Sequence, residues 1–215
     1  MKKMPFLVGP RGGWKMNFPD VSPIMGRLWS PIAAVTSSWN GQDNIQIAVS
    51  ISAASIVPQK PRVLVQIYKS NFSHALIYKS GNFALNFPRK DQLYFIKDFG
   101  LSSGRDFDKL IDVDYSHRSS GSPVLADSWG FLDCRVVNAM DGGDMTCFLA
   151  DVIEGSVLCE GDPMWWRDAR SQIPMEWNEK WNLKIGKEIQ NSENRMGKID
   201  FTPWVDVPCS SYRDL

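Results

Sequence analysis

Between residues 31 and 88 the chain alternates short apolar runs with turn-forming residues, a pattern typical of an antiparallel sheet. The apolar run 31–37 leads into Asn40-Gly41, the dipeptide most typical of a tight hairpin, because both central positions need positive φ. We predict a return strand from about residue 44 to 55. A third strand is predicted over residues 62–68, where β-branched residues alternate with other apolar residues.

One helix is expected within this stretch. Ser70-Asn71 can cap its start, and Phe72, Ala75 and Leu76 recur at helical spacing. Gly81 is placed where a left-handed residue commonly ends a helix. A fourth strand then follows over residues 82–87, before Pro88.

A second hairpin is predicted further along the chain. Its strands cover about residues 131–137 and 146–153, and Asp141-Gly142-Gly143 forms the turn. In the first of these strands Asp133 and Arg135 are expected to face away from the apolar side. Hairpins without a repeating strand–helix–strand unit favour a mainly β protein, a closed antiparallel barrel with a few helices.

The chain therefore divides into three predicted parts. Residues 1–28 form an N-terminal arm, residues 29–160 form the barrel domain, and residues 161–215 form a C-terminal extension that packs on the barrel or on a second copy of the chain. No sustained pattern is seen in this extension, which we predict to be an extended tail. Its tryptophans are core or interface residues, or cover an aromatic ligand: Trp165, Trp166, Trp177, Trp181 and Trp204.

Charge and composition exclude several classes of function. Basic and acidic residues number 24 each among 215, so nothing electrostatic favours nucleic acid or an anionic membrane as partner. No apolar run approaches the roughly 20 residues that span a bilayer, and we expect a cytoplasmic protein. Four cysteines without a CxxC pair and two distant histidines argue against a metal site.

The return strand is unusually rich in small and hydroxyl residues from Ala48 to Ser55. One interpretation is structural, with the hydroxyls satisfying neighbouring backbone groups. The other is that hydroxyls and N–H groups near Ser50 to Ala53 hold a phosphate, helped by the start of the helix near Asn71 and by Ser73. Arg89 and Lys90 would add positive charge. His74, on the same helix, is expected to be a partly exposed surface residue, with a phosphate or cofactor contact as the alternative.

Taken in order, these motifs resemble the flavin reductase-like family of the FMN-binding split-barrel superfamily, close to its flavoredoxin branch. The resemblance covers about residues 28–160. The matching segments are Pro31 to Asn44, Ala48 to Ser55, Ser70 to Ser73, Lys79 to Asn86, Ser103 to Lys109, Pro123 to Val136, Gly143-Asp144 and Ala150 to Val152.

This resemblance implies a homodimeric antiparallel split barrel that binds FMN at the dimer interface, with hydride transfer from NAD(P)H in many members. The isoalloxazine ring would lie along Ile47 to Ser50, with the phosphate near Ser50, Ser52, Asn71 and Ser73. The full set of implied cofactor-binding residues is Ile47, Ala48, Val49, Ser50, Ser52, Ala53, Asn71, Ser73 and Asn86.

One departure from the family pattern leaves the reaction open. Members usually carry His after the Gly-Asp of the second hairpin, near the nicotinamide; here Met145 follows Asp144. A thioether cannot donate the hydrogen bond that imidazole donates. Asp144 and Met145 border the expected donor side, and no catalytic residue is assigned.

Three functions remain open from the sequence. The first is an FMN-dependent oxidoreductase that uses NAD(P)H. The second is an FMN-bound electron carrier or specialised FMN enzyme that does not use NAD(P)H and exchanges electrons with a redox partner protein. The third is a non-catalytic module whose C-terminal tryptophans recognise a ligand or partner.

Overall fold

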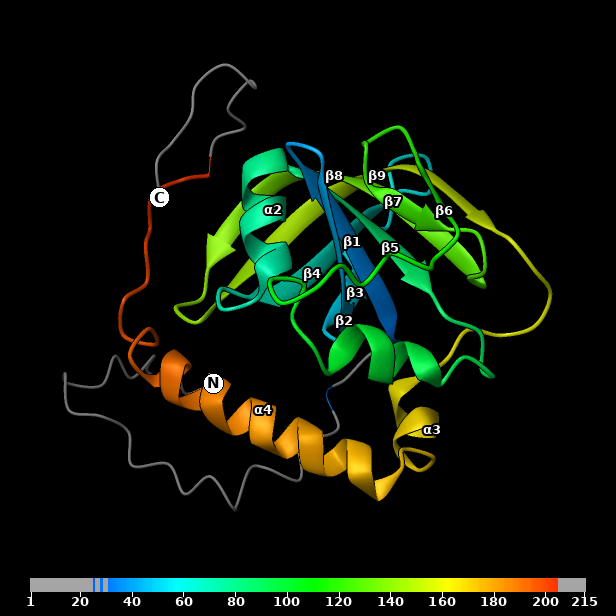
Figure 1. Cartoon of the computed structure of the whole chain (residues 1–215). Coiled ribbons are helices and arrows are strands. Elements are labelled where there is room, and N and C mark those ends of the chain that lie inside the picture. Colours follow the sequence, from blue (N-terminus) through cyan, green and yellow to red (C-terminus); the bar gives the residue numbers. More distant parts are fainter. Residues whose placement is uncertain (1–24, 26–27, 29–30, 205–215) are drawn as a thin grey trace, which may run out of the picture.

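The computed structural model describes Met25, Leu28 and residues 31–204. Its body is a curled antiparallel sheet of seven strands, with helices beside and below it (Figure 1). The sheet order is β2-β1-β5-β8-β9-β4-β3. The strands are β1 (Ala33–Trp39), β2 (Gln42–Ala48), β3 (Ile51–Ala53), β4 (Arg62–Tyr68), β5 (Asn82–Phe87), β8 (Gly130–Asp141) and β9 (Met145–Val157). The N-terminal arm, apart from Met25 and Leu28, lies outside the described residues.

The sheet closes on itself through its two edge strands. β2 and β3 stand at opposite ends of the order but are joined in sequence by Val49-Ser50 alone. β2 pairs with β1, β3 pairs with β4, and the Gln66 N–H donates to the Ser50 carbonyl at 3.1 Å. One bent segment, residues 42–53, therefore joins both edges of a barrel, and the single strand predicted over 44–55 is two.

The local turn and cap chemistry follows the sequence. Asn40 and Gly41 have φ of 50° and 73°, as the predicted hairpin turn requires. Helix α2 (Phe72–Ser80) ends at Gly81, which has φ of 68° and donates its N–H to the Ile77 carbonyl at 2.8 Å. β4 and β5 have the predicted bounds.

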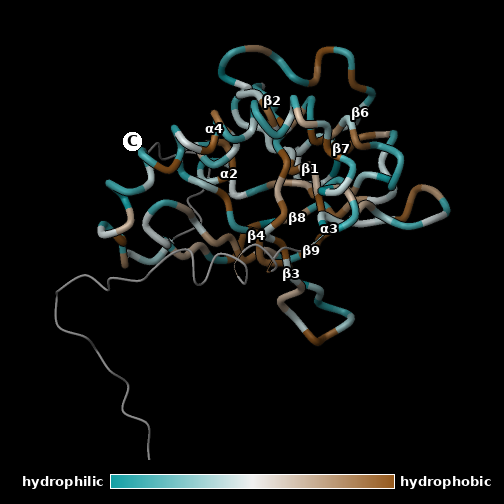
Figure 2. The backbone as a smooth tube through the Cα atoms, turned by 90° about the horizontal axis from the view of Figure 1, so that it is seen from below, coloured by the Kyte–Doolittle hydropathy of each residue, from teal (hydrophilic) through white to brown (hydrophobic). Residues whose placement is uncertain are grey.

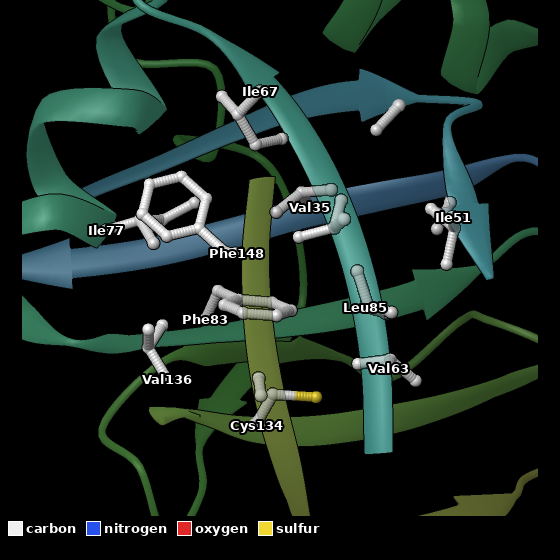
Figure 3. Packing of buried hydrophobic residues seen from close by; sticks show 14 residues of the cluster. Val35, Ile51, Val63, Ile67, Ile77, Phe83, Leu85, Cys134, Val136 and Phe148 are labelled. Carbon is white, nitrogen blue, oxygen red and sulfur yellow. The ribbon is translucent and has the colours of Figure 1, made fainter. Parts of the chain in front are cut away.

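The main core fills the barrel interior. Eight elements, β1, β2, β3, β4, α2, β5, β8 and β9, direct apolar side chains into it (Figure 3). Phe83, Phe148, Ile67 and Ile77 are its largest fully buried members. The buried thiol of Cys134 lies among them, and desolvation raises its pKa, so this cysteine behaves as an apolar core residue.

Asp133 faces away from the barrel interior, as predicted. Its side chain is nevertheless fully buried. The loop before β7 (Pro123–Leu125), which pairs with β6 (Tyr115–His117), covers it, and Ser120 donates both its N–H, at 2.8 Å, and its hydroxyl to the carboxylate. A second layer of chain therefore covers this part of β8.

The region after residue 160 contains helices that the sequence pattern did not predict. α3 spans Trp166–Arg170, and α4 spans Met175–Glu193, crossing below the barrel (Figure 1). The Met164 N–H donates to the Pro88 carbonyl at 2.8 Å, and the Ile32 N–H donates to the Met164 carbonyl, so the extension begins against the barrel wall. A π-helix, η1 (Ile96–Gly100), packs on β2. No helix within the described residues is long and apolar enough to cross a membrane.

Candidate functional site

The bend at Val49-Ser50 is the point where the barrel closes, and its side chains face different surroundings. Ile47 packs under η1, where a Cβ on Gly100 would lie 3.4 Å from its Cγ1. Val49 packs against a cluster of Ile32, Ile96, Met164 and Ala169, and Ala48 is buried in the main core. Ser50 is half-buried, and Ser52 and Ala53 are exposed. The predicted ring-binding stretch is thus a strand edge between η1 and α3.

The start of α2 has the properties of an anion receptor. Asn71 is the N-cap residue, but its side chain makes no capping bond, and no acidic residue occupies the first turn. The Ser70 Oγ is buried without a hydrogen-bond partner among the described residues. The Arg105 Nη1 donates to the Ser70 carbonyl at 2.9 Å, and its guanidinium stacks on Phe72. Helix N–H groups, a hydroxyl and a guanidinium therefore converge at one point.

Arg105 is a residue that sequence reasoning did not assign to the site. It belongs to a connecting loop that residue spacing does not place in space. A side chain at Gly104 would clash with Asn44 of β2, so glycine is what lets this loop approach the barrel. That close approach carries Arg105 to the start of α2.

Two of the predicted cofactor-binding residues already hold hydrogen bonds inside the protein. Ser73 is fully buried, and its Oγ accepts from Asn44 Nδ2 at 2.6 Å. Asn86 is also fully buried; its amide donates to the Ala34 carbonyl at 3.2 Å and accepts from the Leu125 N–H at 2.8 Å. These two polar side chains tie strands and α2 together.

Arg89 and Lys90 do not lie where the sequence argument used them. Arg89 binds Asp127 and Asp91, and Lys90 binds Asp162 at 2.6 Å. Their guanidinium and ammonium groups thus connect the end of β5 to neighbouring loops and to the C-terminal extension. The charge near the α2 start comes from Arg105 instead.

The structure also separates two groups that the sequence argument joined. Ser52 lies opposite Leu64 on β4, whereas α2 begins beyond Tyr68. Four residues of strand, about 13 Å, separate Leu64 from Tyr68. One phosphate therefore does not contact both Ser52 and the start of α2, while Ser50, opposite Gln66, lies between them.

The donor side, where the nicotinamide electron donor is expected, lies where β4 meets the second hairpin. Met145 pairs with Tyr68, and the Asp144 carbonyl accepts from the Lys69 N–H at 2.9 Å. Burial raises the pKa of the Tyr68 phenol, and the carboxylates of Asp144 and of Glu188 on α4 raise it further. A helix of the C-terminal extension therefore reaches this side of the barrel.

His74 is half-buried, as expected of a partly exposed residue, and its ring contacts the barrel wall. Its Nε2 lies 2.8 Å from Thr146 Oγ1, and its ring packs on Tyr78 and Phe148. Burial, with smaller contributions from Lys69 and Arg195, lowers its pKa to about 4. The imidazole is therefore neutral at physiological pH and serves packing.

Two lysines place positive charge beside Ile47. The Lys109 Nζ donates to the Phe99 carbonyl at 3.0 Å and to the Ser102 carbonyl at 3.3 Å, and the Lys184 Nζ, from α4, donates to the Gly100 carbonyl at 2.6 Å. Desolvation lowers the pKa of Lys109 to about 8, with Lys184 adding to the effect. Cations suit these carbonyls at the end of a helix.

Comparison with known proteins assigns this arrangement to a family. Residues 25–174 match the family described as "Flavin reductase like domain". The chain belongs to this family. The flavin reductase-like resemblance predicted from the motifs is thereby confirmed, together with the mainly β fold.

Individual relatives agree with the family match. The chain is 30% identical over 132 residues to the high molecular weight rubredoxin of Moorella thermoacetica, covering 60% of this chain and 57% of the relative. It is 33% identical over 132 residues to the reductase component of 4-nitrophenol 4-monooxygenase/4-nitrocatechol 2-monooxygenase of Rhodococcus opacus, covering 61% and 68%. Among solved structures, flavin reductase PheA2 matches with a TM-score of 0.58 and 26% identity, covering 69% of this chain and 92% of that chain.

These similarities establish function only at the level of the family. The match spans only a little over half of the rubredoxin relative's length. At the level of family, the predicted flavin-dependent oxidoreductase class is confirmed. The bend at Val49-Ser50 and the start of α2 lie on the same barrel. Both therefore belong to the part of the chain that matches the flavin reductase-like family.

Proposed function

We propose that this flavin reductase-like protein binds FMN with its ring along Ile47 to Ser50 and its phosphate at the start of α2. Asn71, Ser70 and Arg105 would hold the phosphate. The observation that carries this proposal is the convergence of the Asn71 N-cap, the Ser70 hydroxyl and the Arg105 guanidinium at that helix start. Asn44, beside the Arg105 loop, is three residues of β2 from Ile47, about 10 Å, a distance that a ribityl chain spans.

The redox chemistry would be that of bound FMN, which would take up a hydride from NAD(P)H and a proton from water, with NAD(P)⁺ as the other product. The chain's own residues bind, orient and shield. Ile47 and Val49 offer an apolar edge to the ring, and the Lys109 and Lys184 ammonium groups favour negative charge developing beside Ile47. No side chain is required as nucleophile, which agrees with the sequence assigning no catalytic residue.

The electron donor is proposed to be NAD(P)H. One observation favours the second candidate, an FMN-bound carrier served by a redox partner protein: Met145 stands where an imidazole hydrogen-bond donor is usual in the family. Anaerobic mixing of the FMN-loaded protein with NADH and with NADPH separates the two. Bleaching of the flavin absorbance is expected from one of the nucleotides; bleaching only by a reduced partner protein would favour the carrier.

We propose further that the protein is a cytoplasmic homodimer. Several apolar side chains are exposed on the hairpin of β8 and β9, and the loop after β3 projects from the barrel (Figure 2). A second copy of the chain would cover such a surface. The exposed side chains are Ile56, Val57, Val137, Met140, Ile153, Val157 and Leu158. Light scattering coupled to size exclusion should give twice the mass of the 24.3 kDa chain.

Titration with FMN and with riboflavin tests the phosphate position. Riboflavin lacks the phosphate, so Arg105→Ala should weaken FMN about tenfold or more and leave riboflavin nearly unchanged, since a charge-assisted hydrogen bond contributes about 1.5–3 kcal/mol. Ser52→Ala is the matched control and should change neither affinity. If Ser52→Ala weakened FMN and Arg105→Ala did not, the phosphate would lie at β3 and the proposed position would be wrong.

A further inference from the structure

Helix α4 is long but only lightly packed. None of its nineteen residues, all described, is buried, although one face carries half-buried side chains. These recur at helical spacing: Trp177, Lys184, Ile185, Glu188 and Ser192. Trp181, on the same face, is 40% exposed. A helix with this composition is held in place by a few anchoring contacts more than by a core.

Those anchors follow one line across the barrel end. Lys184 donates to the Gly100 carbonyl, over Ile47. Glu188, one turn later, lies near Tyr68, the partner of Met145. In Figure 1, α4 runs below the barrel and the chain then rises beside the β8–β9 hairpin. The segment therefore passes in turn over the proposed ring-binding strand and over the expected donor side.

The last anchors lie at the turn of the second hairpin. The Asp200 N–H donates to Asp141 Oδ2 at 3.2 Å, and Trp204 packs against the main core. The chain also touches Gly143 directly: a Cβ there would lie 2.9 Å from the Met196 carbonyl oxygen and 3.1 Å from that of Arg195. Only a glycine allows this approach. Met196 therefore lies against Gly143, which is two residues from Met145 in the sequence.

We propose that residues 175–204, here called the C-terminal strap, close the donor side of the flavin site and exclude a dinucleotide until the strap is displaced. This inference rests on the proposed flavin position. It adds that the strap controls how the electron donor reaches the flavin. A small reductant would reach the flavin with the strap in place. A nicotinamide dinucleotide, which must lay its ring beside Tyr68 and Met145, would meet Glu188 and Met196 first.

Gly143→Ala displaces the strap, and Gly121→Ala is the matched control. Both glycines have positive φ, 94° and 83°, but a Cβ at Gly121 meets nothing within 4 Å, so the control carries the backbone strain without the clash. Lys184→Met removes the other anchor without touching the hairpin. Comparing the three variants separates release of the strap from general strain.

The first readout needs no flavin. In the apo protein, trypsin cleavage after Arg195 and Lys198 should become about tenfold faster in Gly143→Ala and in Lys184→Met, and stay near the wild-type rate in Gly121→Ala. The second readout is anaerobic flavin bleaching. With NADH or NADPH the two releasing variants should be about tenfold faster than wild type once each rate is divided by the same variant's rate with dithionite, which reports any effect of losing the Lys184 charge. Bleaching by dithionite itself should be unchanged in Gly143→Ala and Gly121→Ala, which keep Lys184.

Two results would overturn the inference. One is cleavage that stays at the control rate in both releasing variants, which would show that these contacts do not hold the strap. The other is faster cleavage with unchanged or slower bleaching by the nucleotides, which would show that the strap moves without controlling the donor. Absence of FMN binding in wild type would be a different failure, that of the proposed function itself.

Discussion

The barrel and the C-terminal strap differ in what fixes their structure. In the barrel, side chains from eight elements are buried in one core, and Phe83 and Phe148 are fully enclosed (Figure 3). In the strap, α4 contributes no buried side chain and is placed by Lys184, by the Asp141 and Gly143 turn, and by Trp204. The barrel is stabilised by the burial of apolar side chains. The strap is held in position by a few contacts, which single substitutions can break.

Core truncation should give the largest contrast between the two regions. Phe148→Ala removes a fully buried ring and should lower the free energy of unfolding by about 3–5 kcal/mol. Leu183→Ala, at a side chain that is 73% exposed on α4, should change it by about 0.5 kcal/mol or less. Urea denaturation of both variants measures this. A comparable loss in Leu183→Ala would mean that α4 belongs to the barrel's cooperative core.

Acid should weaken the barrel through His74. Its folded pKa, about 4, lies below its ordinary value of 6.5, so protonation favours the unfolded chain. Protonation of His74 does not affect stability above pH 6.5. Below that pH the free energy of unfolding falls as the pH drops toward 4, by about 2 kcal/mol at pH 5. Denaturation at pH 7 and pH 5 should show this drop in wild type and a smaller drop in His74→Phe.

A control at the other histidine locates the effect. His117 is exposed near Asp43, away from the core, so His117→Phe leaves the half-buried His74 in place and should retain the wild-type drop. If His74→Phe lost as much stability between the two pH values as wild type, the acid sensitivity would arise elsewhere in the molecule.

The smallest effect tests whether α4 opens independently. Gly186 lies inside α4, and a Cβ added there would meet nothing within 4 Å, so Gly186→Ala should stabilise the helix by up to about 1 kcal/mol. Hydrogen exchange of the α4 amides should slow by up to about fivefold, while exchange in β5 and β8 stays unchanged. Equal slowing in both regions would contradict an independently opening strap.

The same contrast explains what the sequence could predict. β4, β5 and α2 were found because burial imposes a period of two or 3.6 on their side chains. Gly81 marks the end of α2, and Asn40-Gly41 marks the end of β1. α4 was missed because its inner face is half-exposed and mixes Trp177 with Lys184 and Glu188, which leaves no apolar period to read.

The candidate site was predicted in part for a similar reason. The N-cap Asn71 could be placed from a local pattern, and the segment Ile47 to Ser50 was implied by the family resemblance. Arg105 could not, since its position depends on a loop packing against Asn44, and the hydrogen bonds that occupy Ser73 and Asn86 join residues far apart in sequence. Long-range contacts of this kind leave no signal in residue spacing.

The central claim is that the barrel takes a flavin whose phosphate lies at the start of α2. Equilibrium titration of the purified protein with FMN and with riboflavin, followed by flavin fluorescence, tests it most directly. We predict saturable binding of FMN about a hundredfold tighter than riboflavin, since two charge-assisted hydrogen bonds to the phosphate contribute about 3 kcal/mol or more. Equal affinity for the two flavins, or no binding of either, would contradict the account.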